Sequence, residues 1–204
     1  MSHDSPSFAV QTVMAEDLPR SVVDAIVALA EPELGPGYLD QHQLLAANHR
    51  APAVAYAVDT SGHLRGFAVS RLMEALVIKL EHPAAREALA AFMWFMGLVE
   101  TVVVSPDTRR QGLGERLVRA ALTDALPPPS FCPLLLPAWR HPDGRVPAER
   151  LALRLGFRPL AIVPDYWFAD SQARGYQCPV CGNPCHCAAN LYLLSDSQPP
   201  SLRT

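Results

Sequence analysis

The chain has 204 residues, 50% of them hydrophobic and 18% charged, and this composition argues against intrinsic disorder. The length fits one domain over residues 1–204, and the formal net charge of −3 argues against nucleic acid and anionic lipid as partners. No segment resembles a secretory signal or has the roughly 20 apolar residues of a membrane span, so we expect a cytoplasmic protein that is not membrane-bound.

The first third of the chain predicts a strand, a helix and a hairpin. "SFAVQTVMAED" indicates a strand, and "DLPRSVVDAIVALA" a helix with one apolar face. A loop at 31–40 and a short helical piece before residue 51 follow. "APAVAYAVD" and "LRGFAVSRL" are then joined by a Gly-containing turn, as in an antiparallel hairpin.

Apolar residues at helical spacing indicate a helix within 84–97, which would pack on the core or on a second subunit. The remaining elements alternate between strands and helices, and the order predicts a mixed α/β layer with a core at 8–195 and a flexible tail at 196–204. They are a strand in "LVETVVVSP", a helix after "RRQGLG", a strand in "FCPLLLPAW", a helix in "PAERLALRLGF", and strands in "FRPLAIVPDYWFAD" and "AANLYLLSD".

The stretch "RRQGLG" (109–114) places glycines and arginines at the start of a helix. The first N–H groups of a helix have no intrahelical partner, so they can surround an anion. Gly112 and Gly114 would allow close approach, and Arg109 and Arg110 would add charge-assisted contacts. The spacing matches neither a P-loop nor a dinucleotide fingerprint, which disfavours nucleoside triphosphates and NAD.

The segment "VVVSPDTRRQGLG" resembles the phosphate-binding signature of the GCN5-related N-acetyltransferases, and "MAEDLP", "HLRGFAVS" and "AERLALRLGF" extend the likeness. The resemblance implies a mixed sheet that splays between its fourth and fifth strands, helices on both faces, and acetyl-coenzyme A as donor. It also implies a set of coenzyme contacts along the fourth strand and the turn after it. These are Val102, Val103, Val104, Arg109, Arg110, Gln111, Gly112, Leu113, Gly114 and Glu115.

The resemblance further implies direct transfer of the acetyl group to an amine. Relatives often carry a carboxylate where this chain has Glu100, so we predict Glu100 as the base, on the strand face shared by Val102 and Val104. A solvated or ion-paired carboxylate is the alternative.

The general acid is harder to assign, because Ala152 stands where many relatives carry a tyrosine. Tyr166 is the predicted substitute, although in some relatives the catalytic tyrosine aligns with Trp167, and Tyr166 could instead pack in the core. Cys132 is interpreted as a core cysteine.

"CPVCGNPCHC" predicts a structural zinc site with Cys178, Cys181, Cys185 and Cys187 as ligands. His186 could replace one thiol. Free thiols, a redox pair or an iron–sulfur cluster are the alternatives.

The cysteines lie at 176–188, in the loop before the last strand, which in the family forms one wall of the acceptor pocket. The loop at 31–40 would form the other wall. Its Glu31, Glu33 and Asp40 would favour a cationic amine, unless they are simply solvated.

Taken together, the sequence predicts an N-acetyltransferase that uses acetyl-coenzyme A, with a small-molecule or protein amine as acceptor, acting as a monomer or a homodimer. Two alternatives are a catalytically weak module that binds acetyl-coenzyme A or a protein partner, and a zinc-dependent nucleic-acid binder. The acidic balance and the lack of basic residues from Cys178 to Leu194 oppose the second.

Overall fold

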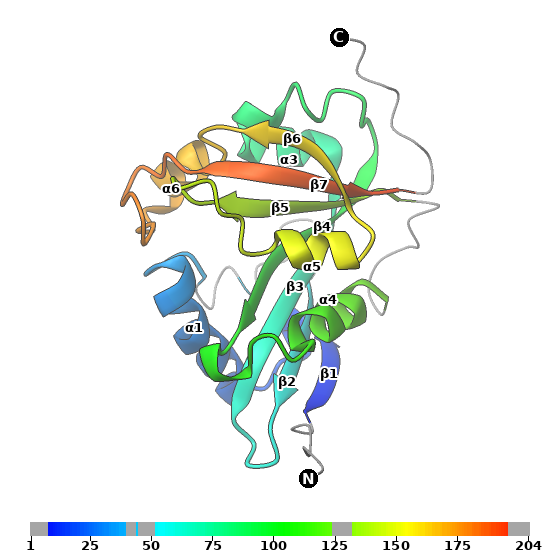
Figure 1. The fold of residues 1–204 in the computed structure, drawn as a ribbon, viewed down its shortest axis with the longest axis vertical. Coiled ribbons are helices and arrows are strands. Elements are labelled where there is room, and N and C mark those ends of the chain that lie inside the picture. Colours follow the sequence, from blue (N-terminus) through cyan, green and yellow to red (C-terminus); the bar gives the residue numbers. More distant parts are fainter. Residues whose placement is uncertain (1–7, 40–43, 45–51, 124–131, 196–204) are drawn as a thin grey trace.

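A computed structural model describes residues 8–39, 44, 52–123 and 132–195 as a seven-stranded mixed sheet with helices on both faces (Figure 1). The strands are β1 (Ala9–Met14), β2 (Ala53–Val58), β3 (Leu64–Glu74), β4 (Phe95–Val104), β5 (Leu134–Arg140), β6 (Arg158–Val163) and β7 (Ala188–Leu194). The helices are α1 (Arg20–Leu34), α3 (Ala75–Glu81), α4 (Leu113–Thr123), α5 (Glu149–Arg154) and α6 (Phe168–Arg174). The strand order is β1-β2-β3-β4-β5-β7-β6. The predicted fold class is confirmed.

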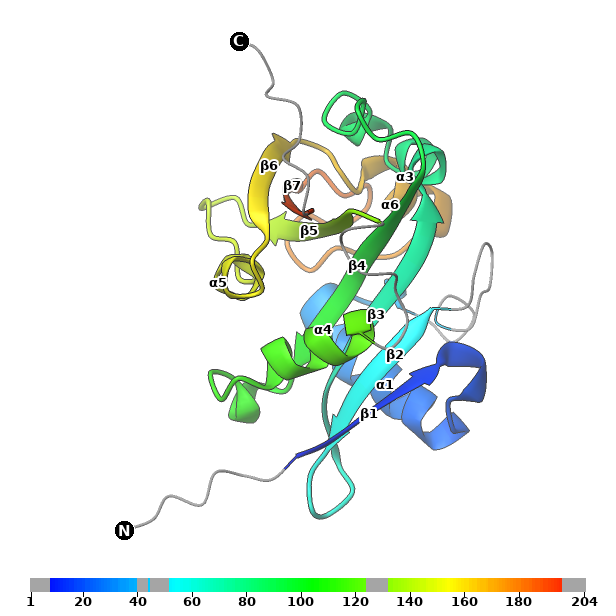
Figure 2. The ribbon, with the colours of Figure 1, turned by 90° about the vertical axis from the view of Figure 1, so that its right-hand side faces the viewer.

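Helices α1 and α4 cover opposite faces of the β1–β4 half of the sheet (Figures 1 and 2). Helix α1 buries Val23 and Ile26 against β2 and β3, and α4 buries Leu113, Leu117 and Ala121 against the other face. Each fully buried leucine or isoleucine contributes roughly 1.5–3 kcal/mol. These two apolar stripes therefore hold the sheet between the helices.

The sheet opens between β4 and β5. The two strands are parallel and pair only through Gly97 with Leu134 and Leu98 with Leu135, within the described chain. Beyond that point β5, β6 and β7 turn across the direction of β3 and β4 (Figure 1). The predicted splay between the fourth and fifth strands is confirmed.

The segment before β4 differs from the prediction. No α-helix occupies 84–97: α3 ends at Glu81, a single 3-10 turn covers Pro83–Ala85, and β4 already begins at Phe95. The amide of Ala75 donates to the carbonyl of Trp94 at 2.7 Å, and Glu74 pairs with Phe95. The end of this segment therefore pairs with β3 in the sheet, although its apolar residues have helical spacing. Met93 is left 75% exposed and Trp94 82% exposed.

The predicted strand in "FRPLAIVPDYWFAD" is also too long. Strand β6 ends at Val163, Asp165 adopts a left-handed φ of 52°, and α6 follows after Trp167. The short helical piece before residue 51 and the tail at 196–204 lie outside the described residues. Among the residues described, no helix is long and apolar enough to cross a membrane.

Candidate active site

The open edge of β4 lies next to the turn that begins α4. From Val99 to Val104, apart from the extra residue Glu100, β4 is paired with β3 on one side, and no strand of the described residues pairs with the other side. The side chains of Val102 and Val104 are half-buried against the core on the α4 side. An extended chain could therefore add to this edge through backbone hydrogen bonds.

The turn before α4 presents a row of free amides. Within the described residues, the N–H groups of 110–115 have no hydrogen-bond acceptor. Arg110 and Gly112 take left-handed φ values of 64° and 79°, which curl the backbone so that successive N–H groups can converge. The turn is exposed, and a Cβ on Gly112 would meet no atom within 4 Å. The turn is thus open for an anion, while Leu113 anchors it in the core.

The arginines of this turn are placed differently from each other. Arg109 pairs with Glu33 of α1 at 2.5 Å and donates to the carbonyl of Val104 at 3.0 Å. Arg110 is exposed and has no partner among the described residues. Gln111 donates to the carbonyl of Asp107 at 3.4 Å. One guanidinium therefore braces the turn, and the other is available to an incoming anion.

Glu100 lies at a β-bulge on the splayed strand. Val69 faces Thr101 and Ser70 faces Val99, so Glu100 is the extra residue and the alternation that we used to place it is interrupted there. Its carboxylate accepts a hydrogen bond from the Arg71 guanidinium in an ion pair. Glu100 remains 25% exposed, which leaves its carboxylate accessible.

Tyr166 lies in the turn between β6 and α6, not on a strand. Its side chain is 1% exposed, and its hydroxyl has no hydrogen-bond partner among the described residues. The ring stacks on His82 at 4.1 Å and contacts Trp167 edge-on at 4.9 Å. Burial raises the pKa of Tyr166 well above its usual value. Ala152, at the position where relatives carry a tyrosine, is a fully buried residue of α5.

The four clustered cysteines converge on one point. Their Sγ atoms all lie within 4.8 Å of one another, and three pairs are separated by 3.5 to 3.7 Å. Four thiolates around Zn²⁺ at about 2.3 Å would have sulfurs about 3.8 Å apart. The spacing therefore fits a tetrahedral metal site and is far from the roughly 2.05 Å of a disulfide.

The backbone around the cysteines supports the same interpretation. Cys178 and Gly182 exchange two backbone hydrogen bonds of 3.1 and 2.9 Å, closing a tight turn. The amide of His186 donates to the sulfur of Cys181 at 3.2 Å. A hydrogen bond from Cys185 and the amides of Val180 and Cys181 lower the pKa of Cys178 below its usual value. The His186 ring lies 2.9 Å from Asp165 instead of joining the sulfurs.

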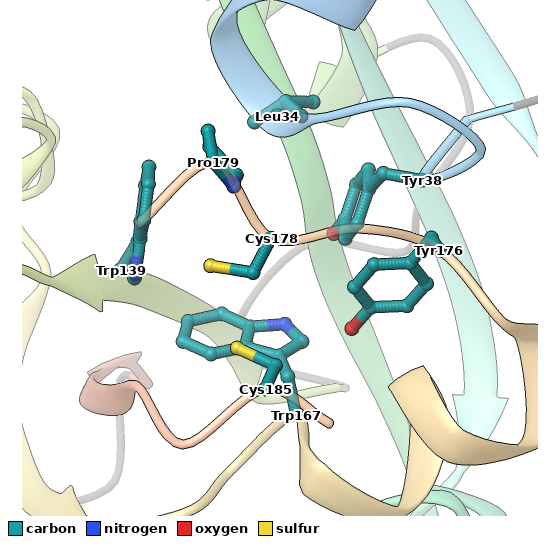
Figure 3. Close-up of a pocket in the computed structure, with 8 residues that line it drawn as sticks. All are labelled: Leu34, Tyr38, Trp139, Trp167, Tyr176, Cys178, Pro179 and Cys185. Atoms are coloured by element: carbon teal, nitrogen blue, oxygen red, sulfur yellow. The ribbon is translucent and has the colours of Figure 1, made fainter. Parts of the chain in front are cut away.

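An apolar pocket of about 50 Å³ lies between the two predicted acceptor walls (Figure 3). Leu34 and Tyr38 come from the end of α1 and its loop, and Trp139 comes from β5. The remaining lining residues belong to the segment between β6 and β7. They are Trp167, Tyr176, Cys178, Pro179 and Cys185.

The pocket reaches the splayed strand through Tyr38. Burial and the nearby Glu100 carboxylate raise the pKa of Tyr38, and its hydroxyl lies close to that of Thr101. Sequence reasoning missed Tyr38, Trp139 and Tyr176. The signal for Tyr38 was its place in "GPGYLD", directly in the predicted wall, whereas nothing in the sequence brings Trp139 to this loop.

A mixed sheet that opens beside an exposed, glycine-containing turn is the architecture of an acyltransferase that uses an acyl-coenzyme A. A sequence profile of the Acetyltransferase (GNAT) family matches residues 23–157, more than half of the chain, and the chain belongs to this family. No curated protein of similar sequence was found.

Several solved structures share the fold. Arabidopsis thaliana NAA60 in complex with a bisubstrate analogue is 16% identical, with a TM-score of 0.62 over 91% of this chain and 97% of that chain. The ribosomal-protein-S18-alanine N-acetyltransferase from Escherichia coli is 15% identical, with a TM-score of 0.56 over 96% and 99%. The Drosophila melanogaster polyamine N acetyltransferase is 15% identical, with a TM-score of 0.58 over 93% and 100%. The last two neighbours are named for different amines, an alanine of a ribosomal protein and a polyamine, and at this identity the likeness defines the fold and not the acceptor.

Proposed function

We propose that the chain transfers the acetyl group of acetyl-coenzyme A to an amine of a small molecule or a protein. The observation that carries the proposal is an edge of β4 that, within the part of the chain that the structure describes, is unpaired and lies beside a turn whose amides have no acceptor. The edge would pair with the pantetheine arm, and the turn would hold the pyrophosphate. The contacts would be Val102, Val103, Val104, Arg109, Arg110, Gln111, Gly112, Leu113, Gly114 and Glu115.

The transfer would proceed by direct attack. The amine nitrogen, freed of a proton by Glu100 directly or through water, forms a bond to the thioester carbon. The carbonyl oxygen takes up negative charge and is stabilised by an amide of the open strand near Val104. The carbon–sulfur bond then breaks, the coenzyme thiolate receives a proton from Tyr166, and the second proton of the attacking nitrogen returns to Tyr166 directly or through water. The products are an N-acetylated amine and free coenzyme A.

The cysteines would hold zinc as a structural ion. Four thiolates complete a tetrahedral shell and leave no open position for substrate, so the ion would act by fixing the 176–188 loop. A reducing compartment such as the cytoplasm would keep these thiols free to bind it.

A second candidate is an acetyl-coenzyme A-binding module with little turnover. It is favoured by the ion pair of Glu100 with Arg71 and by the burial of Tyr166 under His82. Both candidates predict that acetyl-coenzyme A raises the melting temperature of the protein.

Thiol release separates the two candidates. Release that is slow without amine and accelerated by members of an amine and peptide panel is the expected result. A protein that binds acetyl-coenzyme A and shows no acceleration with any amine would be the binding module.

A further inference from the structure

Helix α5 carries two arginines on the side that faces the start of α4. A Cβ built on Gly114, in the first turn of α4, would lie 3.8 Å from Cδ2 of Leu151, so the two helices meet there (Figure 1). Because each helical residue is rotated by about 100° from the one before it, Arg154 and Arg150 lie about 60° and 100° from Leu151 around α5. Glu149 lies on the opposite side, where its carboxylate accepts a hydrogen bond from β7 at 3.1 Å. Both arginines are therefore on the flank of α5 next to α4.

These arginines have no partner within the described chain. Arg150 and Arg154 are exposed, and neither guanidinium has an ion-pair or hydrogen-bond partner among the residues that the structure describes. Arg110, in the turn before α4, is in the same state. The acidic side chains at neighbouring positions of the sequence already have partners. These pairs are Asp143 with Arg145, Glu115 with Arg119, and Glu149 with Tyr192. Although the chain has a net charge of −3, this face is locally positive.

Coenzyme A carries two separate anionic groups that a protein can bind. The pyrophosphate joins the pantetheine arm to the ribose, and a phosphate monoester is attached to the 3′ oxygen of that ribose. The amides of 110–115 suit the pyrophosphate. The monoester has a charge of about −1.5 to −2 at neutral pH and three acceptor oxygens, and the planar fork of a guanidinium matches two of them. This second group is therefore best matched by arginines close to the turn, and α5 provides them.

From this geometry we infer that Arg150 and Arg154 bind the ribose 3′-phosphate of acetyl-coenzyme A, so that the protein selects the coenzyme over its 3′-dephospho form. The inference rests on the proposed acetyl transfer and adds a determinant of coenzyme specificity to it. The two arginines contact the end of the coenzyme that is distant from the thioester. They therefore raise the affinity for the coenzyme and leave the chemical step unchanged.

The test removes the charge from either partner of the contact. Coenzyme A and 3′-dephospho-coenzyme A are titrated into wild type and into the Arg150→Gln/Arg154→Gln double variant, and the dissociation constants are measured by calorimetry. The free thiol forms are used because they cannot be turned over. Arg20→Gln/Arg86→Gln is the matched control, because it removes the same charge from two exposed arginines at the start of α1 and after α3.

We expect wild type and the control to bind coenzyme A about tenfold more tightly than the dephospho form, a modest factor because the contacts are exposed to solvent. The double variant should bind the two forms within about twofold of each other, and its affinity for the dephospho form should equal that of wild type. Equal affinities in wild type, or a preference that survives in the double variant, would overturn the inference alone. Binding of neither form to wild type would overturn the proposed acetyl transfer as well.

Salt and steady-state kinetics provide two further readouts. The preference of wild type should decrease when salt is added, because exposed charges are screened. In the double variant the KM for acetyl-coenzyme A should rise by about tenfold and kcat should stay unchanged. A preference that salt does not reduce, or a loss confined to kcat, would show that the two arginines do not bind the 3′-phosphate.

Discussion

The two sides of the splayed sheet are built in different ways. The coenzyme side is made of backbone from one continuous stretch, 99–115, in which a strand with one open edge runs into a turn whose amides have no acceptor among the described residues. The acceptor side is made of side chains from α1, β5 and the loop between β6 and β7. A short local motif can specify the first kind of site, whereas the second depends on bringing distant segments together.

The two acceptor walls are held directly against each other. The amide of Gln177 donates to the carbonyl of Pro36 at 3.0 Å. A Cβ at Gly35, which has a φ of 96°, would lie 1.8 Å from the carbonyl oxygen of Gln177, so only glycine permits this approach. The acceptor side therefore depends on the cysteine loop keeping its shape, and the coenzyme side does not.

Loss of the proposed metal ion is the change expected to affect the two sides most unequally. Cys181→Ser removes one of four ligands, and structural zinc sites contribute on the order of 10 kcal/mol of apparent binding free energy in small peptides. We expect metal content to fall well below one equivalent and amide hydrogen exchange to rise across 176–187. Strands β1 to β4 should stay protected, and acetyl-coenzyme A should still bind.

Cys132→Ala is the control, because Cys132 is a buried cysteine whose thiol donates to the carbonyl of Phe95 at 3.3 Å, outside the cluster. It should keep its metal. Equal metal content in wild type and Cys181→Ser would contradict the proposed metal site. Equal amide exchange rates across 176–187 would contradict its role in shaping the pocket.

Glu100 lies where the two sides meet. Replacing it should therefore lower the rate of acetyl transfer and leave the affinity for acetyl-coenzyme A unchanged. Glu100→Gln is expected to lower kcat by about a hundredfold, within the usual range for loss of a general base. Arg71→Gln breaks the same ion pair but keeps the carboxylate, so its kcat should fall much less. Steady-state kinetics and acetyl-coenzyme A affinity are measured for both variants. Equal losses of kcat in the two variants would show that the ion pair has a structural role and that Glu100 is not the general base.

The coenzyme side is also the part that could be predicted from the sequence. "RRQGLG" after an apolar strand indicates free amides at a helix start, because the backbone geometry is local. The cysteine cluster could be predicted for the same reason, since all four thiols fall within ten residues. The resemblance to a family supplied the splay, which no local pattern shows.

The acceptor side could be predicted only in outline. The apolar residues of 84–97 have helical spacing, but the end of this segment pairs with β3 as part of β4. Hydrogen bonds between segments distant in sequence therefore outweighed the local pattern. Tyr166 looked like a strand residue, yet the left-handed turn at Asp165 carries it under His82. The meeting of Trp139 with the cysteine loop depends on β5 pairing with β7, a contact between residues about 50 positions apart.

A negative charge placed in the turn before α4 should weaken the binding of acetyl-coenzyme A and leave the acceptor side unchanged. Gly112→Glu adds a carboxylate where the pyrophosphate would lie, and we expect the affinity for acetyl-coenzyme A to fall about thirtyfold, or roughly 2 kcal/mol. Gly62→Glu is closely matched: the two glycines have φ values of 79° and 81°, and neither has an atom within 4 Å of a built Cβ. Both variants should lose similar stability. Comparable affinity in the two would show that the turn does not bind the coenzyme.

The smallest expected effect concerns the proposed acid. Among the described residues, neither the Tyr166 nor the Tyr176 hydroxyl has a hydrogen-bond partner, and both are buried, so replacing either tyrosine by phenylalanine should leave the free energy of unfolding unchanged or slightly higher. If Tyr166 protonates the departing thiolate, Tyr166→Phe lowers kcat by about tenfold, a modest loss because a thiolate leaves readily. Tyr176→Phe should keep its kcat and change only the KM of the acceptor. Full activity in Tyr166→Phe would move the acid role to Tyr38, whose hydroxyl lies beside Thr101 on the open strand.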